Sequence, residues 1–141
     1  MGQQQILILV LTIVIVSIAV YIGIDLVDTS VRGKHVDLLV NHTVMVASEA
    51  VVWRTKGTPF LGGGGSYSDL DTEGMNQLLM EENRLPGTVQ ITRATADELE
   101  VTAVSDYYPE LGVLTRVEGT EIVNTEISYD GSITLPSVPT P

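Results

Sequence analysis

The sequence predicts an α+β fold, in which a long amino-terminal α-helix, apolar and then amphipathic, packs on a small carboxy-terminal antiparallel β-sheet of about four strands. Two observations carry this prediction. Residues 1–24 contain no charged side chain, and Ile6–Ile24 runs almost entirely through Ile, Leu and Val. Residues 88–128 instead alternate β-branched or leucine side chains with polar ones, which is typical of strands that bury one face.

The apolar segment is long enough to cross a membrane. An α-helix over Ile6–Ile24 would be roughly 28 Å long, close to the ~30 Å hydrocarbon thickness of a bilayer. A secretory signal peptide has a basic stretch before a shorter apolar core, whereas Gly2-Gln3-Gln4-Gln5 precedes the core here. We therefore expect the segment to be retained, and we assign residues 1–27 to the apolar part of the helix.

The helical pattern continues as an amphipathic one over residues 28–57. Its apolar residues recur mostly at spacings of three, four and seven, which predicts one buried helix face. These residues are Val27, Val31, Leu38, Leu39, Val44, Val46, Ala47, Val52 and Trp53. The positive charge of Lys56 in the last turn interacts favourably with the helix dipole, and Gly57 could take the left-handed conformation that ends helices. One continuous helix from Gly2 to Lys56 is expected.

Residues 58–70 contain four consecutive glycines, Gly62–Gly65, and are expected to form a flexible linker. A phosphate-binding loop is the alternative, but the Lys-Ser/Thr pair that such a loop needs does not follow the last glycine.

Residues 71–141 are expected to form a globular head. Asp71–Asn83 fits a short amphipathic helix that ends before Pro86-Gly87. Four strands then follow with short connections, which predict antiparallel neighbours. The strands are Thr88–Arg93, Glu98–Val104, Gly112–Glu118 and Glu121–Ser128. Their expected apolar face is Val89, Ile91, Leu99, Val101, Val113 and Ile122, covered by the second half of the long helix. The proline-rich tail, Thr134–Pro141, is not expected to pair as a central strand.

One stretch resembles a metal-binding motif. Asp69, Asp71 and Glu73 echo the first, third and fifth ligands of a calcium loop, and Gly74 follows. The twelfth position, where a bidentate carboxylate is expected, is Met80. We favour the competing interpretation, in which Ser68 or Asp71 caps the short helix.

The remaining chemistry is sparse. His35 and His42 are seven residues apart, or about 10 Å along a helix, too far to share a metal ion within one chain. The chain has no Cys, and its carboxylates form no recognisable acid/base or nucleophile motif. We expect no enzymatic activity and no cofactor.

The charge of the chain argues against nucleic acid as a partner. The formal net charge is −11, and the seven Lys and Arg residues form no cluster. A phosphate backbone would therefore be repelled.

The uncharged polar tetrad, the apolar segment Met1–Val27, the amphipathic continuation and the small sheet domain together resemble type IV pilins and pilin-like filament subunits. The resemblance implies a helical homopolymer, whose apolar helices are first stored in the cytoplasmic membrane and are then packed together in the filament core by the pilus assembly machinery. The core residues that it implies here are Gln5, Ile6, Leu9, Ile13, Val16, Val20 and Ile24. It also implies a leader cleaved before assembly, and a mass spectrum of the native protein would decide whether Met1 is the mature first residue.

Two positions depart from the pattern of that family. Most pilins carry a glutamate at the fifth mature position, which pairs with a neighbour's terminal amine, whereas this chain has the uncharged Gln5 there. Many bacterial pilins have a proline near the twenty-second position, where this chain has Ile22-Gly23. Glycine costs about 1 kcal/mol relative to alanine in a helix, so any local unwinding is expected near Gly23.

The expected function is that of a structural subunit in an extracellular filament, serving adhesion or motility. A single-pass membrane-anchored protein with a small binding domain, or a minor pilin-like secretion component, is the alternative. A third alternative is an archaeal filament subunit of similar plan.

Overall fold

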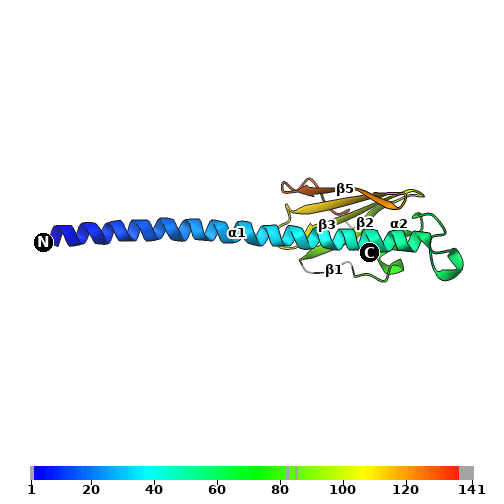
Figure 1. Cartoon of the computed structure of the whole chain (residues 1–141), viewed down its shortest axis with the longest axis horizontal. Coiled ribbons are helices and arrows are strands. Elements are labelled where there is room, and N and C mark those ends of the chain that lie inside the picture. Colours follow the sequence, from blue (N-terminus) through cyan, green and yellow to red (C-terminus); the bar gives the residue numbers. More distant parts are fainter. Residues whose placement is uncertain (1, 82, 85, 137–141) are drawn as a thin grey trace. The chain divides into compact units, whose positions relative to one another are not determined.

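The computed structural model describes residues 2–81, 83–84 and 86–136. These residues fall into two compact units, Met1–Lys34 and His35–Pro141. The elements, in order along the chain (Figure 1), are α1 (Gly2–Thr55), the 3-10 helix η1 (Thr58–Phe60), α2 (Leu70–Gln77), β1 (Asn83–Arg84), β2 (Gly87–Ala94), β3 (Glu98–Ser105), β4 (Gly112–Glu118) and β5 (Glu121–Ser128). The predicted α+β class, with a long amino-terminal helix and an antiparallel sheet, is confirmed.

The sheet is an antiparallel meander in the order β1-β2-β3-β4-β5. The four predicted strands are present to within a residue or so at each end, and the two-residue β1 adds a fifth that pairs with the start of β2. The register shifts once between Ile91 and Arg93 and once between Arg116 and Val117. Each shift changes which side chains face the core, because side chains alternate along a strand.

The core of the second unit lies between the sheet and α1 from His35 onward. The buried residues of α1 are Val36, Leu39, Thr43, Val46, Ala47, Ala50 and Trp53. Five of them, Leu39, Val46, Ala47, Ala50 and Trp53, join a cluster with the buried strand residues Val89, Leu99, Val101, Ala103, Val113 and Val117. A hydroxyl relay also crosses the interface, since Thr115 donates to Thr43 at 3.0 Å and Thr43 donates to the Val40 carbonyl. The predicted cover of the sheet by the second half of the helix is confirmed.

Parts of the predicted faces are wrong. Leu38 and Val52 are exposed, because the buried face of α1 follows positions 36, 39, 43, 46, 50 and 53. Ile122 is also exposed, and Ile91 is only half-buried. Ile122 pairs with the buried Val117 and shares its face of the sheet, but it lies on β5, which is an edge strand, and its side chain remains 40% exposed.

The carboxyl end of α1 is capped by the glycine-rich segment. Gly57 is extended, with φ −67°, so the predicted left-handed cap at this position is wrong. Instead the amides of Gly63, Gly64 and Gly65 donate to the carbonyls of Trp53, Lys56 and Arg54 at 2.8–3.0 Å. A Cβ on Gly63 would lie 2.3 Å from the Trp53 ring, so only glycine allows this close approach. The tetraglycine stretch thus satisfies the last carbonyls of the helix.

A buried tyrosine and a cation join this cap to the sheet. The Arg54 guanidinium lies 5.0 Å from the Tyr67 ring centroid, donates to the Gly65 carbonyl at 2.7 Å and contacts Asp97 at 2.6 Å. The Tyr67 hydroxyl donates to the carbonyl of Gly119, in the β4–β5 turn, at 2.6 Å. Burial raises the pKa of Tyr67, and the nearby Arg54 charge opposes that rise.

The helix expected over Asp71–Asn83 is shorter than predicted, because α2 ends at Gln77. Leu79 adopts φ 56°, and the Met80 amide bonds to the Met75 carbonyl, which closes the helix early. The predicted cap is also wrong: Asp69 is the N-cap residue and makes no side-chain capping bond. Residues 134–136 of the tail are irregular, and residues 137–141 lie outside the described part.

Candidate functional site

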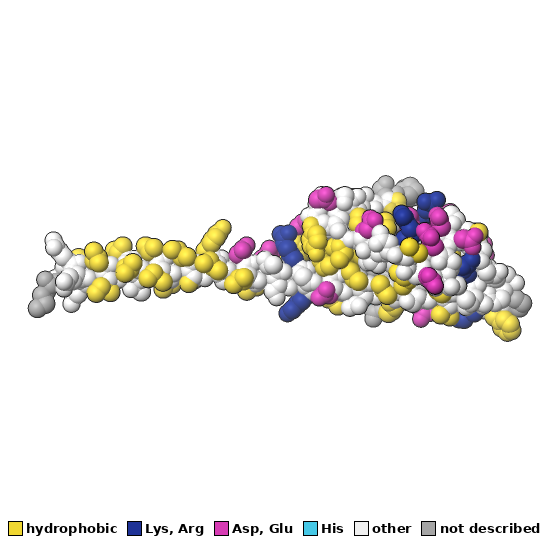
Figure 2. All heavy atoms as spheres, turned by 45° about the horizontal axis from the view of Figure 1, so that its top comes forward, with side chains coloured by type: hydrophobic (Ala, Val, Ile, Leu, Met, Phe, Trp, Pro, Cys, Tyr) yellow, Lys and Arg dark blue, Asp and Glu magenta, His cyan; other side chains and the backbone are white. Residues whose placement is uncertain are grey.

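The apolar amino-terminal segment is the strongest candidate for a functional surface. Within the first unit every Ile, Leu and Val from Ile6 to Val27 is exposed, the least exposed being Val14 at 48%. Figure 2 shows hydrophobic side chains gathered along this part of the helix. The implied core residues Ile6, Leu9, Ile13, Val16, Val20 and Ile24 are all among the exposed ones. The chain itself therefore does not bury this surface in the described structure.

The two hydroxyl groups of Thr12 and Ser17 do not interrupt the apolar character of this helix. Thr12 donates to the Ile8 carbonyl at 2.8 Å and Ser17 donates to the Ile13 carbonyl at 2.7 Å. Hydroxyls bonded back to the preceding turn need no partner from the surroundings. The segment can therefore enter a nonpolar environment without leaving these groups unsatisfied.

Helix α1 could span a membrane by its length and composition, with a mean hydropathy of 3.0 in its most apolar window. Charged side chains begin at Asp25, and the first ion pair follows one turn later, between Arg32 and Asp28 at 2.9 Å. Gln5 is exposed on the same face as Ile8 and Leu9. The boundary between apolar and charged surface thus lies immediately after Ile24.

Gly23 is helical in the structure, and a Cβ placed there would meet no atom within 4 Å. The helix is continuous through this position. Unwinding near Gly23 in an assembled form stays a prediction.

The acidic stretch that resembled a calcium loop lies at the start of α2. Asp69 precedes the helix and Asp71 is exposed in its first turn. The side chain of Glu73 lies outside the described part. Over residues 2–81, 83–84 and 86–136, no group of three or more His, Cys, Asp or Glu side chains is placed to hold a metal ion.

The two histidines lie in different surroundings. His35 makes edge-to-face contacts with Tyr107 and Tyr108, with ring centroids 5.4 and 5.3 Å apart, and its Nδ1 is buried without a partner among the described residues. His42 lines a groove instead. The spacing of the residues along the chain did not predict either tyrosine contact.

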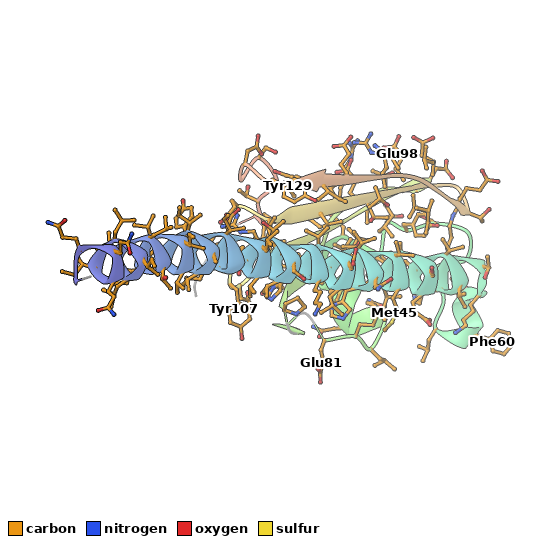
Figure 3. All side chains as sticks on the ribbon, turned by 60° about the vertical axis from the view of Figure 1, so that its left-hand side comes forward. Met45, Phe60, Glu81, Glu98, Tyr107 and Tyr129 are labelled. Carbon is orange, nitrogen blue, oxygen red and sulfur yellow. The ribbon has the colours of Figure 1, made fainter. Side chains whose placement is uncertain are left out.

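That groove, of about 380 Å³, lies between α1 and the segment after α2. It is lined by His42, Met45, Val46, Leu79, Met80, Glu81 and Val89. Met45 and Glu81 lie on the same side of α1 in Figure 3. Sequence reasoning missed this groove, because it depends on the left-handed turn at Leu79, and leucine is not a residue that signals such a turn.

Comparisons of the chain with protein-family models, with curated proteins and with solved structures gave no match.

Proposed function

We propose that this protein is the structural subunit of an extracellular helical filament of the type IV pilus kind, assembled through its hydrophobic amino-terminal helix and serving adhesion or motility. The observation that supports the proposal most is the exposed apolar surface of Ile6–Ile24, carried on the same helix that begins the folded unit at His35. A helix that is apolar on every side requires a nonpolar environment around it.

Two environments meet that requirement, lipid and other copies of the helix. In lipid, helices attract one another by van der Waals packing and not by the hydrophobic effect. Once the helices leave the membrane, burial of apolar surface at about 25 cal/mol per Å² contributes on the order of tens of kcal/mol gross per subunit. We therefore propose that the cytoplasmic membrane holds the subunit before assembly, and that its partners are other copies and the assembly machinery.

The alternative function is that of a single-pass membrane protein with a small binding domain, or a minor pilin-like secretion component. The same helix supports it, since α1 could span a membrane. Unlike the filament proposal, this alternative predicts a low copy number and a helix that stays in contact with lipid.

The test is electron microscopy of material shed from the producing cells, with mass spectrometry of the fibres. The proposal expects fibres composed of this polypeptide. Protein found only as a dispersed species in the membrane fraction would contradict it and favour the membrane anchor.

A matched pair of variants separates the two functions further. The double variant Leu9→Ala/Ile13→Ala keeps the segment apolar enough to insert, yet it removes side-chain volume that helices need to pack against each other. The filament proposal expects unchanged membrane insertion and a large loss of fibres. A control double variant, Leu9→Ile/Ile13→Leu, conserves volume and should retain fibres.

A further inference from the structure

Two leucines in the second unit adopt a conformation that is unfavourable for leucine. Leu61 and Leu79 both have φ 56°, in the left-handed region, and they are the non-glycine residues with positive φ in the described part of the chain. Their side chains are also almost fully exposed, at 89% and 93%. Glycine or asparagine would suit the backbone, and a polar residue would suit the exposure. The stability of the isolated chain therefore does not explain why these two positions are leucine.

Leu61 belongs to an apolar projection at the carboxyl end of α1. It follows Phe60, which is 78% exposed, and we call these two residues the knob. Figure 3 shows Phe60 pointing away from the end of α1. Short-range bonds hold the backbone, since Phe60 donates to Gly57 and Leu61 donates to Thr58. The glycine cap fixes the following residues on α1, so the knob is held in place before any partner binds.

Leu79 belongs to the rim of the groove already described, which is lined by Met45, Val46, Met80 and Val89 with Glu81 at the edge. A volume of about 380 Å³ is within the range of pockets that hold small ligands, so the groove has room for large side chains. Leu61 thus lies on a projecting apolar surface, and Leu79 lies at the rim of an apolar groove.

The charges beside the two surfaces are opposite. Lys56 is exposed and adjoins the knob, because Gly64 donates to its carbonyl and Gly62 lies against its Cβ. Glu81 is exposed at the groove. Two copies of a chain with net charge −11 repel each other. Attraction between Lys56 beside the knob of one copy and Glu81 at the groove of another would offset part of that repulsion.

We infer that the knob of one copy docks in the groove of the next copy, with Lys56 facing the neighbour's Glu81, as a head-to-tail contact within the proposed filament. This contact rests on the proposed function. Met45 and Lys56 are roughly 16 Å apart along α1, so the two surfaces of one copy are too distant to serve each other. A contact between two different surfaces repeats from copy to copy, and it builds an open helical assembly when the rotation between copies does not close into a ring.

Disulfide trapping tests the contact, because the chain has no Cys and only introduced thiols can react. Full-length copies carrying Leu61→Cys are co-expressed with copies carrying Met45→Cys, and the fibres are oxidised. The contact predicts crossed dimers in more than roughly tenfold excess over either variant alone, because docking gives the thiols a high effective concentration. The double variant Leu61→Cys/Met45→Cys should give a ladder of multimers.

The matched control pairs Leu61→Cys with Tyr129→Cys, because Tyr129 is at least as exposed as Met45, at 62% against 43%, and lies on the other side of α1 in Figure 3. Fibres whose crossed yield does not exceed this control contradict the docking contact and leave the filament standing. Strong dimers of Leu61→Cys alone would also overturn it, since they indicate a symmetric contact. If no fibres form, the proposed function fails and the inference fails with it.

Four further variants separate a contact from a structural role. Leu61→Gly removes both the apolar side chain and the backbone cost, so the melting temperature should hold or rise while the fibre yield falls; a normal fibre yield contradicts the inference. Lys56→Glu and Glu81→Lys should each lower the crossed-disulfide yield, by up to roughly fivefold, and the double reversal should restore it. Failure of that restoration contradicts the assigned charge pair.

Discussion

Helix α1 runs through both units of the chain, and its two halves have opposite surroundings. From Ile6 to Ile24 the helix is apolar on every side and exposed, whereas from His35 to Thr55 it is apolar along one face, which the sheet buries. Most helices in proteins are stabilised by tertiary packing and not by propensity. The second half satisfies that condition within the chain, whereas the described residues bury no side of the first half, for which we propose lipid and then other copies as packing partners.

The largest effect on folding should come from truncating the same residue type in each half. Leu39→Ala should lower the free energy of unfolding of the second unit by about 2–5 kcal/mol, because Leu39 is fully buried against the sheet. Leu9→Ala should leave that free energy unchanged, because Leu9 is exposed in the first unit. Thermal unfolding of the full chain in micelles, followed by the β-sheet signal, measures both. Equal losses for the two variants would break the distinction between the units.

A pair of glycines sharpens the comparison. Gly63→Ala should destabilise the second unit by about 1–3 kcal/mol, because the new methyl would overlap the Trp53 ring. Gly23→Ala meets open space and should raise the helicity of α1, with a gain of up to about 1 kcal/mol. Chemical denaturation and helical circular dichroism check the pair. If Gly23→Ala also prevents fibre formation, local unwinding at Gly23 is required for assembly.

A smaller effect is expected at the hydrogen bond between Tyr67 and Gly119. Tyr67→Phe should cost about 1 kcal/mol, since it leaves the carbonyl without its donor. Burial raises the folded pKa of Tyr67 above the unfolded value of 10.0. The folded state therefore holds this proton more tightly, and its stabilising effect is lost as the pH rises above about 10. Melting curves across that range should show a steeper alkaline decline for the wild type than for Tyr67→Phe.

The smallest effect concerns the turn after β5. Ser128 donates to Asp130 at 2.6 Å and the Ser132 amide donates at 3.0 Å, and these bonds lower the pKa of Asp130 to about 2. The stabilisation is present above about pH 4 and is lost as the pH falls toward 2. Asp130→Asn should flatten this part of the acid unfolding curve. An unchanged acid profile would show that the bonds do not persist in solution.

The sequence predicted elements well where one local pattern decides them. The strand limits follow from alternation and turn residues, and the helix end follows from glycine and proline after Lys56. Features that depend on distant contacts were missed. The glycine cap requires Trp53 beneath Gly63, and the groove requires a left-handed turn at a leucine. Ile122 pairs with the buried Val117 but is exposed because β5 is an edge strand, and the order of strands in the sheet is not visible in the residues of β5.

The most direct test of the account is the environment of Val16 in shed fibres. A spin label is introduced through Val16→Cys, diluted with unlabelled copies, and its accessibility to oxygen and to a polar relaxation agent is measured. The account predicts an immobile label with low accessibility to both agents, because neighbouring helices surround it. High oxygen accessibility with a mobile signal would place Val16 against lipid and would contradict the claim that this helix packs on copies of itself.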